Sequence, residues 1–268
     1  MGVKFFKRNK IDQFFTQGSI TVTDGIATNP GQDFAYLLRN RNNTSGWMTT
    51  GSTDAGNTTL IADMGEGKDL DKIILVNHNF KAFTIKYWNG ASYVDFSPAI
   101  SQTVNTETVS IYSFASVSTT KIRIIITAAQ VLNADKRMTQ LIMTEQLGEL
   151  ACQPMLTPKI DRSRKVNKFL SGRVFISKSV PSFEVKLKMN TSVTETDLAL
   201  VETLYDSFES FLVWLSGGDV AQFGAHIRQG YRLQDFYLVN LDAEYVPEYK
   251  DGRWPHGVPI NLSLQETN

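Results

Sequence analysis

Between residues 20 and 147 the sequence consists of short runs in which apolar and polar residues alternate, with turn signals between them. In the run 120–129, Ile122 and Ile124 point one way and Arg123 the other, because successive side chains of a strand face opposite sides of a sheet. Many such strands without a long helix indicate a β-sandwich or jelly roll. We therefore predict a mainly β fold, with a sandwich over 20–148. The predicted strands are 20–25, 58–65, 71–80, 82–88, 108–114, 120–129 and 138–148.

The segment YWNGASYVDF, residues 87–96, predicts a β-hairpin with aromatic residues around a tight turn. Asn89-Gly90 is the strongest signal, because a type I′ turn needs positive φ at both central residues. Strand alternation places Tyr87 toward the core and Trp88 on the other face. An exposed Trp88 is suited either to stacking on a sugar or to a contact with another subunit.

Residues 149–173 contain two prolines and an excess of basic residues, which predicts a linker between domains. We interpret the basic run as a solvated linker, with a contact to an acidic neighbouring surface as the functional alternative. Residues 1–19 form a basic arm that contains phenylalanines. The arm either packs on its own chain, as a short helix or an extended segment, or reaches a neighbouring subunit.

Residues 174–268 combine alternating strands with one amphipathic helix, predicted over 194–215. Ser192 and Glu195 have capping-box spacing, and Thr194 is a competing N-cap. The expected buried stripe is Leu198, Val201, Tyr205, Phe208, Leu212 and Leu215. Further apolar residues lie beside this stripe and in the N-terminal arm. The candidate inter-subunit contacts are Phe5, Phe6, Leu200, Leu204 and Phe211.

The composition excludes several functional classes. The chain has 27 basic and 27 acidic side chains, so it lacks the net positive charge expected of an electrostatic nucleic-acid binder. Cys152 is the single cysteine, so no intrachain disulfide can form. The N-terminus has no signal-peptide pattern, and no apolar run is long enough to span a membrane. We expect folding in a cytoplasm and no membrane insertion.

No motif in the sequence indicates catalysis. The three histidines, His78, His226 and His256, do not have the spacing of metal ligands. A Gly-x-Ser-x-Gly elbow is absent, and the glycine-containing segment 63–72 leads into a strand, so we interpret it as a turn and not as a phosphate-binding loop. We expect no enzymatic activity, no catalytic residues, no metal and no cofactor.

The order of LLRNRNNTSGWMTT, TTLIADMG, LDKIILVNHNF, FTIKYWNGASYVDF and KIRIIIT resembles the discoidin, or F5/8 type C, family over about half the chain. The matching segments are Trp47, Asp63 to Gly65, Ile73-Ile74, Tyr87 to Tyr93 and Lys121 to Ile124. The resemblance implies a galactose-binding-like jelly roll. It does not extend to the family's acidic calcium loop, because residues 39–43 carry no acid, nor to its paired cysteines. The candidate glycan or subunit contacts are Trp47, Asn43, Asn77, His78, Asn79 and Trp88.

The C-terminal half resembles the tail-tube and baseplate-hub domains of bacteriophage tails. It shares with them an alternating strand, one helix, and a final alternating strand within RWPHGVPINLSLQE. The resemblance implies a split β-barrel that associates into rings. Our first hypothesis is a structural virion protein of a phage tail or tail tip, of the distal or minor tail protein type. Copies of the chain would assemble into a ring in the host cytoplasm and would bind other tail proteins. The ring would connect the tail tube to tip or fibre components. The alternative is a carbohydrate-binding module or adhesin that contacts host cell-surface glycan through the jelly-roll loops.

Overall fold

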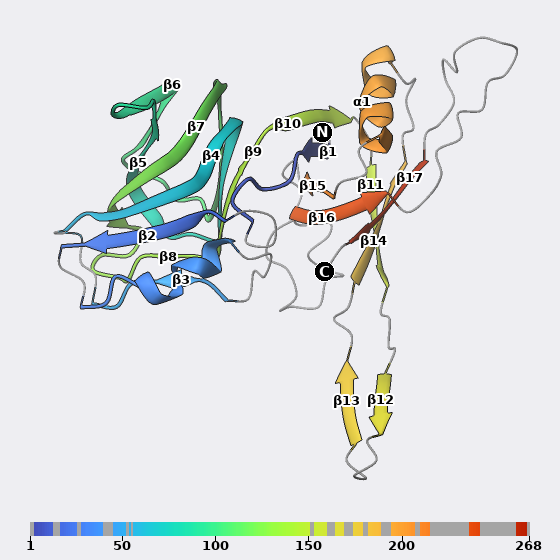
Figure 1. Cartoon of the computed structure of the whole chain (residues 1–268), viewed down its shortest axis with the longest axis horizontal. Helices are drawn as coiled ribbons and strands as arrows, with labels where there is room; N and C mark the ends of the chain where they lie inside the picture. Colours follow the sequence, from blue (N-terminus) through green and yellow to red (C-terminus); the bar gives the residue numbers. More distant parts are fainter. Residues whose placement is uncertain are drawn as a thin grey trace, which may run out of the picture. The chain divides into compact units, whose positions relative to one another are not determined.

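The computed structural model describes most of residues 3–150, then 194–206 and 210–214, and the backbone of six further strands. Within 3–150, residues 13–16, 26–27, 40–44, 52–53 and 55 lie outside the description. Antiparallel strands make up almost all of the described elements, so the predicted mainly β fold is confirmed. The chain divides into two compact units (Figure 1). The sandwich unit is Lys7–Gln146 with Phe223–Gln234; the second unit is Met1–Phe6, Leu147–Gln222 and Asp235–Asn268.

The sandwich unit is built on two long strands, β4 (Thr58–Val76) and β7 (Val109–Ala129). Its main sheet has the order β2-β4-β7-β5-β6, and β9 also pairs with β4. The remaining elements of the unit are β2 (Ser19–Asp24), η1 (Gln32–Arg39), β3 (Trp47–Met48), β5 (Phe80–Trp88), β6 (Tyr93–Gln102), β8 (Arg137–Met138) and β9 (Gln140–Thr144).

Irregularities inside β4 and β7 let each strand contribute to both layers of the sandwich. The first part of β4, up to Asp63, lies between β2 and β7, whereas its last part, from Lys72, lies between β9 and β7. The register with β7 shifts between Asp63 and Lys68, where Gly65 has a φ of 81°. Segment 63–72, predicted as a turn between two strands, is therefore an irregular stretch within one strand.

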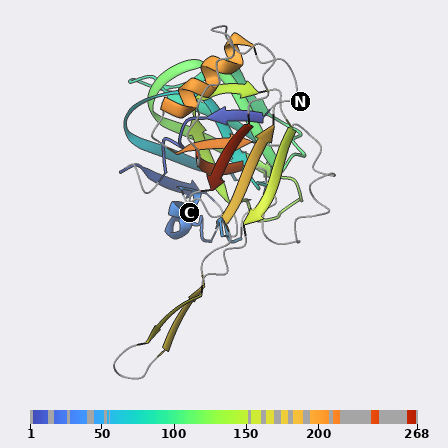
Figure 2. The ribbon, with the colours of Figure 1, turned by 90° about the vertical axis from the view of Figure 1, so that its right-hand side faces the viewer.

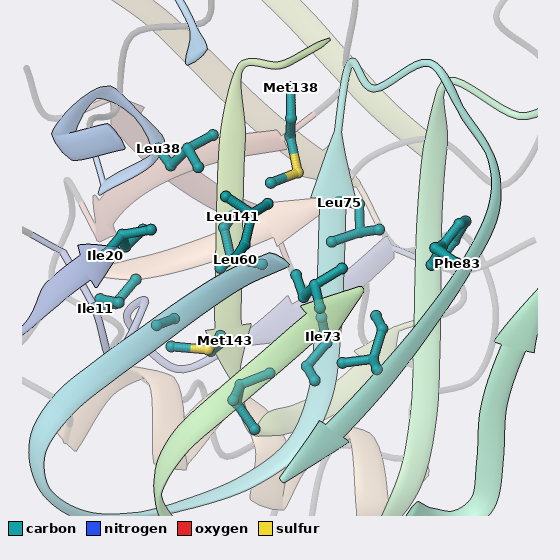
Figure 3. Close-up of a cluster of buried hydrophobic side chains, with 14 of the residues drawn as sticks. Ile11, Ile20, Leu38, Leu60, Ile73, Leu75, Phe83, Met138, Leu141 and Met143 are labelled. Atoms are coloured by element: carbon teal, nitrogen blue, oxygen red, sulfur yellow. The ribbon is translucent and has the colours of Figure 1, made fainter. Parts of the chain in front are cut away.

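The apolar faces of both layers close on one core. Leu60 from the first part of β4 and Ile73 from its last part belong to the same buried cluster, together with Phe83 of β5 and Leu141 of β9 (Figure 3). Ile122, Ile124 and Ile126 of β7 are buried as the alternation predicts.

The aromatic hairpin connects β5 and β6, but its turn differs from the predicted one. Trp88 pairs with Tyr93, so four residues and not two form the loop. Only Gly90 has a positive φ, of 99°. The side chain of Asn89 accepts hydrogen bonds from the backbone N–H groups of Ala91, at 3.0 Å, and Ser92, at 2.9 Å. Because its carboxamide closes the loop in this way, Asn89 does not need the left-handed conformation of a type I′ turn.

The second unit contains a seven-stranded sheet of order β10-β1-β15-β16-β17-β14-β11, part of which Figure 2 shows face on. A separate two-stranded ribbon, β12 with β13, lies outside this sheet. The strands are β1 (Val3–Phe6), β10 (Gln146–Leu150), β11 (Gln153–Lys159), β12 (Arg164–Lys168), β13 (Val174–Lys178), β14 (Ser182–Lys188), β15 (Phe211–Trp214), β16 (Phe236–Leu241) and β17 (Asn261–Glu266).

Helix α1 (Glu195–Asp206) is shorter than predicted. Phe211 and Leu212, predicted within the helix, lie in β15 instead, because that segment pairs with β1 and β16. Ser192 lies outside the described residues, and Thr194 is the N-cap. Its hydroxyl accepts a hydrogen bond from the Asp197 backbone N–H at 3.2 Å, and the Asp197 carboxylate accepts one from the Thr194 N–H at 2.9 Å.

Two other predicted segments have different roles in the structure. Residues 3–6 of the predicted arm form β1, which pairs with β15 of the same chain. The arm therefore packs on its own chain, at least over these residues. The predicted linker 149–173 contains β11 and β12, and β11 is a strand of the seven-stranded sheet. Its alternation is weak in sequence because two prolines interrupt it, which is compatible with an edge strand.

Candidate functional site

Trp47, a predicted glycan contact, is part of the core. Its side chain is 1% exposed, and its indole N–H donates a hydrogen bond to the Pro30 carbonyl at 3.0 Å. The ring lies 6.3 Å from that of Phe80, edge on. Gly31, with a φ of 76°, leaves the space that the indole fills, because a Cβ there would be 2.6 Å from Trp47 Nε1. The prediction that Trp47 is displayed for a ligand is therefore wrong.

His78 and Asn79 also hold loops together; His78 is buried, and Asn79 is half-buried. His78 is 1% exposed, and its Nε2 lies 2.9 Å from the Ser110 hydroxyl. Burial lowers the pKa of His78 from 6.5 to about 4, so the ring is neutral at pH 7. Asn79 donates to the Asp135 carbonyl at 2.8 Å and accepts from the Arg137 N–H at 2.9 Å.

Two further residues of the predicted glycan contact remain. Asn77, half-buried, has a φ of 50° at the end of β4. Asn43 lies outside the described residues.

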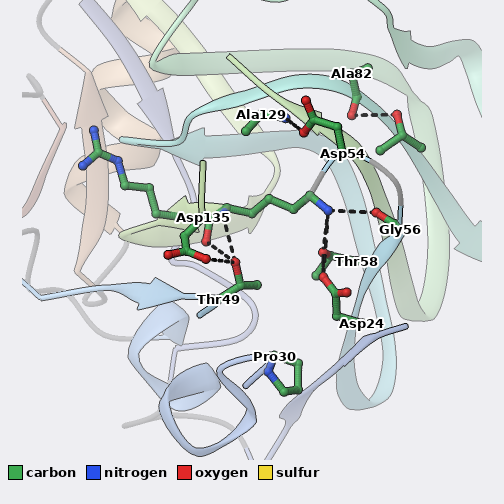
Figure 4. A network of polar contacts seen from close by, with 12 residues as sticks. Asp24, Pro30, Thr49, Asp54, Gly56, Thr58, Ala82, Ala129 and Asp135 are labelled. Atoms are coloured by element: carbon green, nitrogen blue, oxygen red, sulfur yellow. Dashed lines mark hydrogen bonds and ion pairs between the residues drawn. The ribbon is translucent and has the colours of Figure 1, made fainter. Parts of the chain in front are cut away.

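A buried lysine fixes other loops of the sandwich unit (Figure 4). Lys136 is fully buried, and its ammonium donates to the Gly56 carbonyl at 3.0 Å and to the Thr58 hydroxyl at 2.9 Å. The Asp24 carboxylate lies 3.9 Å away. Burial lowers the pKa of Lys136, while Asp24 and Asp54 oppose that change. Since Lys136 is fully buried and binds Gly56 and Thr58 within the unit, we assign this network a structural role.

The outer face of the sheet carries a different aromatic group. Trp88 and Tyr93, paired across the hairpin, are half-buried, with ring centroids 5.1 Å apart. The Arg123 guanidinium lies 4.3 Å from the centre of the Tyr93 ring, at cation–π distance. The Thr119 hydroxyl donates to the Trp88 carbonyl at 2.7 Å, which ties the hairpin to β7. These contacts hold the two rings in place beside a fixed cation.

An open hollow of about 330 Å³ lies where the irregular stretch of β4 begins, next to the middle of β7. It is lined by the glycines Gly18 and Gly65 and by Gln17, Ser19, Asp63, Thr120 and Lys121. Within it, the Lys121 ammonium lies 2.9 Å from the Asp63 carboxylate.

Both members of this ion pair are charged at neutral pH. Burial alone would raise the pKa of Asp63, but the hydrogen bonds from Lys121 and from the Gly65 N–H outweigh it, and the pKa is lowered. The bond to Asp63 raises the pKa of Lys121, and Tyr93 adds to this rise, so Tyr93 lies near the hollow. The hollow therefore presents a carboxylate and an ammonium that largely neutralise each other.

We name these residues the outer site: Trp88, Tyr93, Arg123, Asp63, Lys121 and the other residues that line the hollow. Sequence analysis identified Trp88 alone among them. A signal for two others was present, because Lys121 and Arg123 alternate with the buried isoleucines of β7 and must lie on the outer face. Asp63 likewise alternates with the buried Leu60, Ala62 and Met64, but only the register of β4 brings it opposite Lys121.

The five predicted inter-subunit contacts lie in the interior of the chain. Phe5, Phe6 and Leu204 are fully buried, Phe211 is 2% exposed and Leu200 is 8% exposed. The Phe5 and Phe211 rings lie 6.0 Å apart, and Leu200 packs at Gly148 of β10. These five residues are therefore interior residues and not the surface between subunits that we predicted. The buried face of α1 also differs from the predicted stripe, because the helix ends at Asp206.

Among the described residues, no group of three or more His, Cys, Asp or Glu side chains could hold a metal ion. None of the described helices has the length and hydropathy needed to cross a membrane.

No family model and no curated protein matches the sequence. Among solved structures, the chitosan-binding module 1 of a Paenibacillus sp. IK-5 chitosanase/glucanase is 11% identical, with 51% of this chain and 98% of that chain covered and a TM-score of 0.40. CpGH89CBM32-5 from Clostridium perfringens, in complex with GalNAc-β-1,3-galactose, is 12% identical, with coverages of 46% and 94% and a TM-score of 0.37. A putative α-L-fucosidase from Bacteroides thetaiotaomicron is 11% identical, with coverages of 47% and 28% and a TM-score of 0.39. Carbohydrate-binding proteins thus recur among the similar structures, but at these identities and TM-scores the likeness carries no argument about this chain's function.

Proposed function

We propose that the sandwich unit binds a neutral glycan at the outer site and acts as a binding module without catalysis. The observation that carries this proposal is the open polar hollow beside the fixed Trp88–Tyr93 pair. Aromatic faces stack on the C–H faces of sugar rings, and nearby polar groups fix the orientation of a ligand. Asp63 can accept hydrogen bonds from sugar hydroxyls, and Lys121 can donate them.

The charge of the site favours a neutral sugar over an acidic one. The Asp63–Lys121 pair has no net charge, and Arg123 already lies over the Tyr93 ring. A carboxylated or sulfated sugar would have to compete with Asp63 for Lys121, or with the Tyr93 ring for Arg123. A neutral hydroxyl-rich ring can instead exchange hydrogen bonds with both members of the pair.

The test is a screen of the full chain against neutral and acidic oligosaccharides, followed by calorimetry on the hits. Trp88→Ala and Asp63→Asn should each weaken binding about tenfold or more. Tyr36→Ala is the matched control, because Tyr36 is an exposed aromatic residue of η1. Equal affinity of Trp88→Ala and wild type would refute the site. Mass spectrometry of the recovered sugar checks for cleavage.

We propose, as a second candidate, a structural role in a phage tail or tail tip, in which copies of the chain form a ring connecting the tail tube to tip or fibre components. The seven-stranded sheet supports this candidate, because its outermost strands β10 and β11 each have one hydrogen-bonded neighbour in the sheet. Such edges can pair with another chain. Electron microscopy of the purified chain should show particles of one fixed symmetry. A homogeneous monomer that binds sugar would contradict the ring and support only the first proposal.

A further inference from the structure

The ribbon formed by β12 and β13 carries a charge that its own pairing does not balance. Its ten paired residues include Arg164, Lys165, Lys168 and Lys178 and no acid. Arg164 and Lys178 are directly opposite each other in the backbone register of the ribbon. Like charges in this position destabilise a strand pair.

Among the strands that the structure describes, none other pairs with the ribbon. It forms a two-stranded sheet of its own, beyond the ends of β11 and β14 in Figure 1. An isolated two-stranded hairpin is marginally stable in water. An acidic surface lying along the ribbon, which contains Arg164, Lys168 and Lys178, would reduce the repulsion and support the two strands.

Helix α1 presents a surface of the opposite charge. Its sequence, ETDLALVETLYD, contains no basic residue. Three acids, Glu195, Glu202 and Asp206, are exposed and fall on one side of the helix, away from Val201 and Leu204; we call them the acidic stripe.

The acidic stripe is also unfavourable by itself. Glu202 and Asp206 are a like-charge pair four residues apart, which destabilises a helix. Asp206 lies in the last turn, where the helix dipole favours a cation. No ion pair joins the three acids to any other described residue.

We propose that the ribbon of one copy docks on the acidic stripe of a second copy. The lengths are comparable: Arg164 and Lys168 lie about 13 Å apart along a strand, and the stripe spans about 16 Å of helix. Each partner relieves the like-charge repulsion of the other. Ribbon and stripe are different surfaces, so the contact is heterologous, and repeating it produces a closed ring or an open filament. The proposal is independent of glycan binding, which concerns the other unit.

Charge exchange between full-length variants tests this contact. Sedimentation equilibrium should show that the wild type self-associates at about 100 μM in about 50 mM salt, and less at higher salt. The ribbon variant Arg164→Glu/Lys178→Glu and the stripe variant Glu202→Lys/Asp206→Lys should each associate about tenfold more weakly. An equimolar mixture of the two should associate again, because a negative ribbon then meets a positive stripe.

Lys81→Glu is the matched control. Lys81 is exposed in β5 of the sandwich unit, and its reversal should not change association. Far-ultraviolet circular dichroism shows whether each variant is folded. A wild type that stays monomeric under these conditions would overturn the proposal. So would an oligomer that neither reversal weakens, or a mixture of the two reversed variants that fails to associate.

Discussion

Trp47 and Trp88 belong to the same sandwich and lie in opposite environments. Trp47 is 1% exposed among Pro30, Gly31 and Phe80, whereas Trp88 is half-buried on the outer face beside Tyr93. Both residues are aromatic and both were candidate ligand contacts, Trp88 because strand alternation places it on the face away from the core. The comparison shows that residue type does not distinguish an anchor of the core from a binding platform; the layer in which the residue lies does.

Replacing Trp47 should have the largest effect. Trp47→Ala leaves a large cavity and removes the hydrogen bond to Pro30, so it should lower the free energy of unfolding by about 3–5 kcal/mol. Trp88→Ala should lower it by about 1 kcal/mol or less, because half of its contacts are with solvent. Urea denaturation measures both. Equal losses for the two variants would show that the two environments do not differ as described.

Removing the buried cation should have the next largest effect. Lys136→Met keeps the volume of the side chain but leaves the Asp24 carboxylate buried without its counter-charge. We expect a loss of about 3–4 kcal/mol in the free energy of unfolding. The double variant Lys136→Met/Asp24→Asn should recover part of this loss. A Lys136→Met variant as stable as the wild type would mean that the ammonium does not hold these loops.

Protonation of His78 should make the fold less stable in acid. The pKa of His78 is about 4 in the folded chain and 6.5 in an unfolded one, so the unfolded chain binds more protons between these two pH values. The stability of the fold therefore falls as the pH drops from 6.5 to 4, by up to about 3 kcal/mol from this group.

Unfolding measured across this pH range, with His78→Gln as the control, isolates the contribution of His78. Whatever its absolute stability, the variant should depend less on pH in this window. Parallel pH profiles of variant and wild type would contradict the buried, neutral His78.

The smallest effect concerns the hairpin that carries the outer site. Gly90 has a φ of 99° and open space around it, so Gly90→Ala meets backbone strain and no clash. It should cost about 1 kcal/mol of unfolding free energy. Asn89→Ala, which removes two hydrogen bonds to the loop, should cost a similar amount. If neither change alters stability or glycan binding, the loop does not position Trp88 and Tyr93.

Much of the fold could be predicted because strand alternation is a local signal. The buried faces of 82–88 and 120–129 follow from their own sequences, and the structure confirms them at Phe83, Ile85 and Ile122. The merging of 58–65 with 71–80 into β4 could not be predicted, because glycine and acidic residues between them are typical of a turn. Pairing with β7 on both sides of the irregular stretch keeps the strand continuous.

The outer site could be predicted only in part. The sequence determines that Trp88, Lys121 and Arg123 lie opposite the apolar face of their strands, because the side chains of a strand alternate with period two. The tertiary structure determines which of them meet, because the register of β4, β5, β6 and β7 brings Asp63 to Lys121 and Tyr93 to Arg123. The end of the helix could not be predicted from the sequence either. Its apolar spacing continues past Asp206, but pairing of the next segment with β1 and β16 turns it into β15, and local propensity cannot report a partner more than two hundred residues away in the chain.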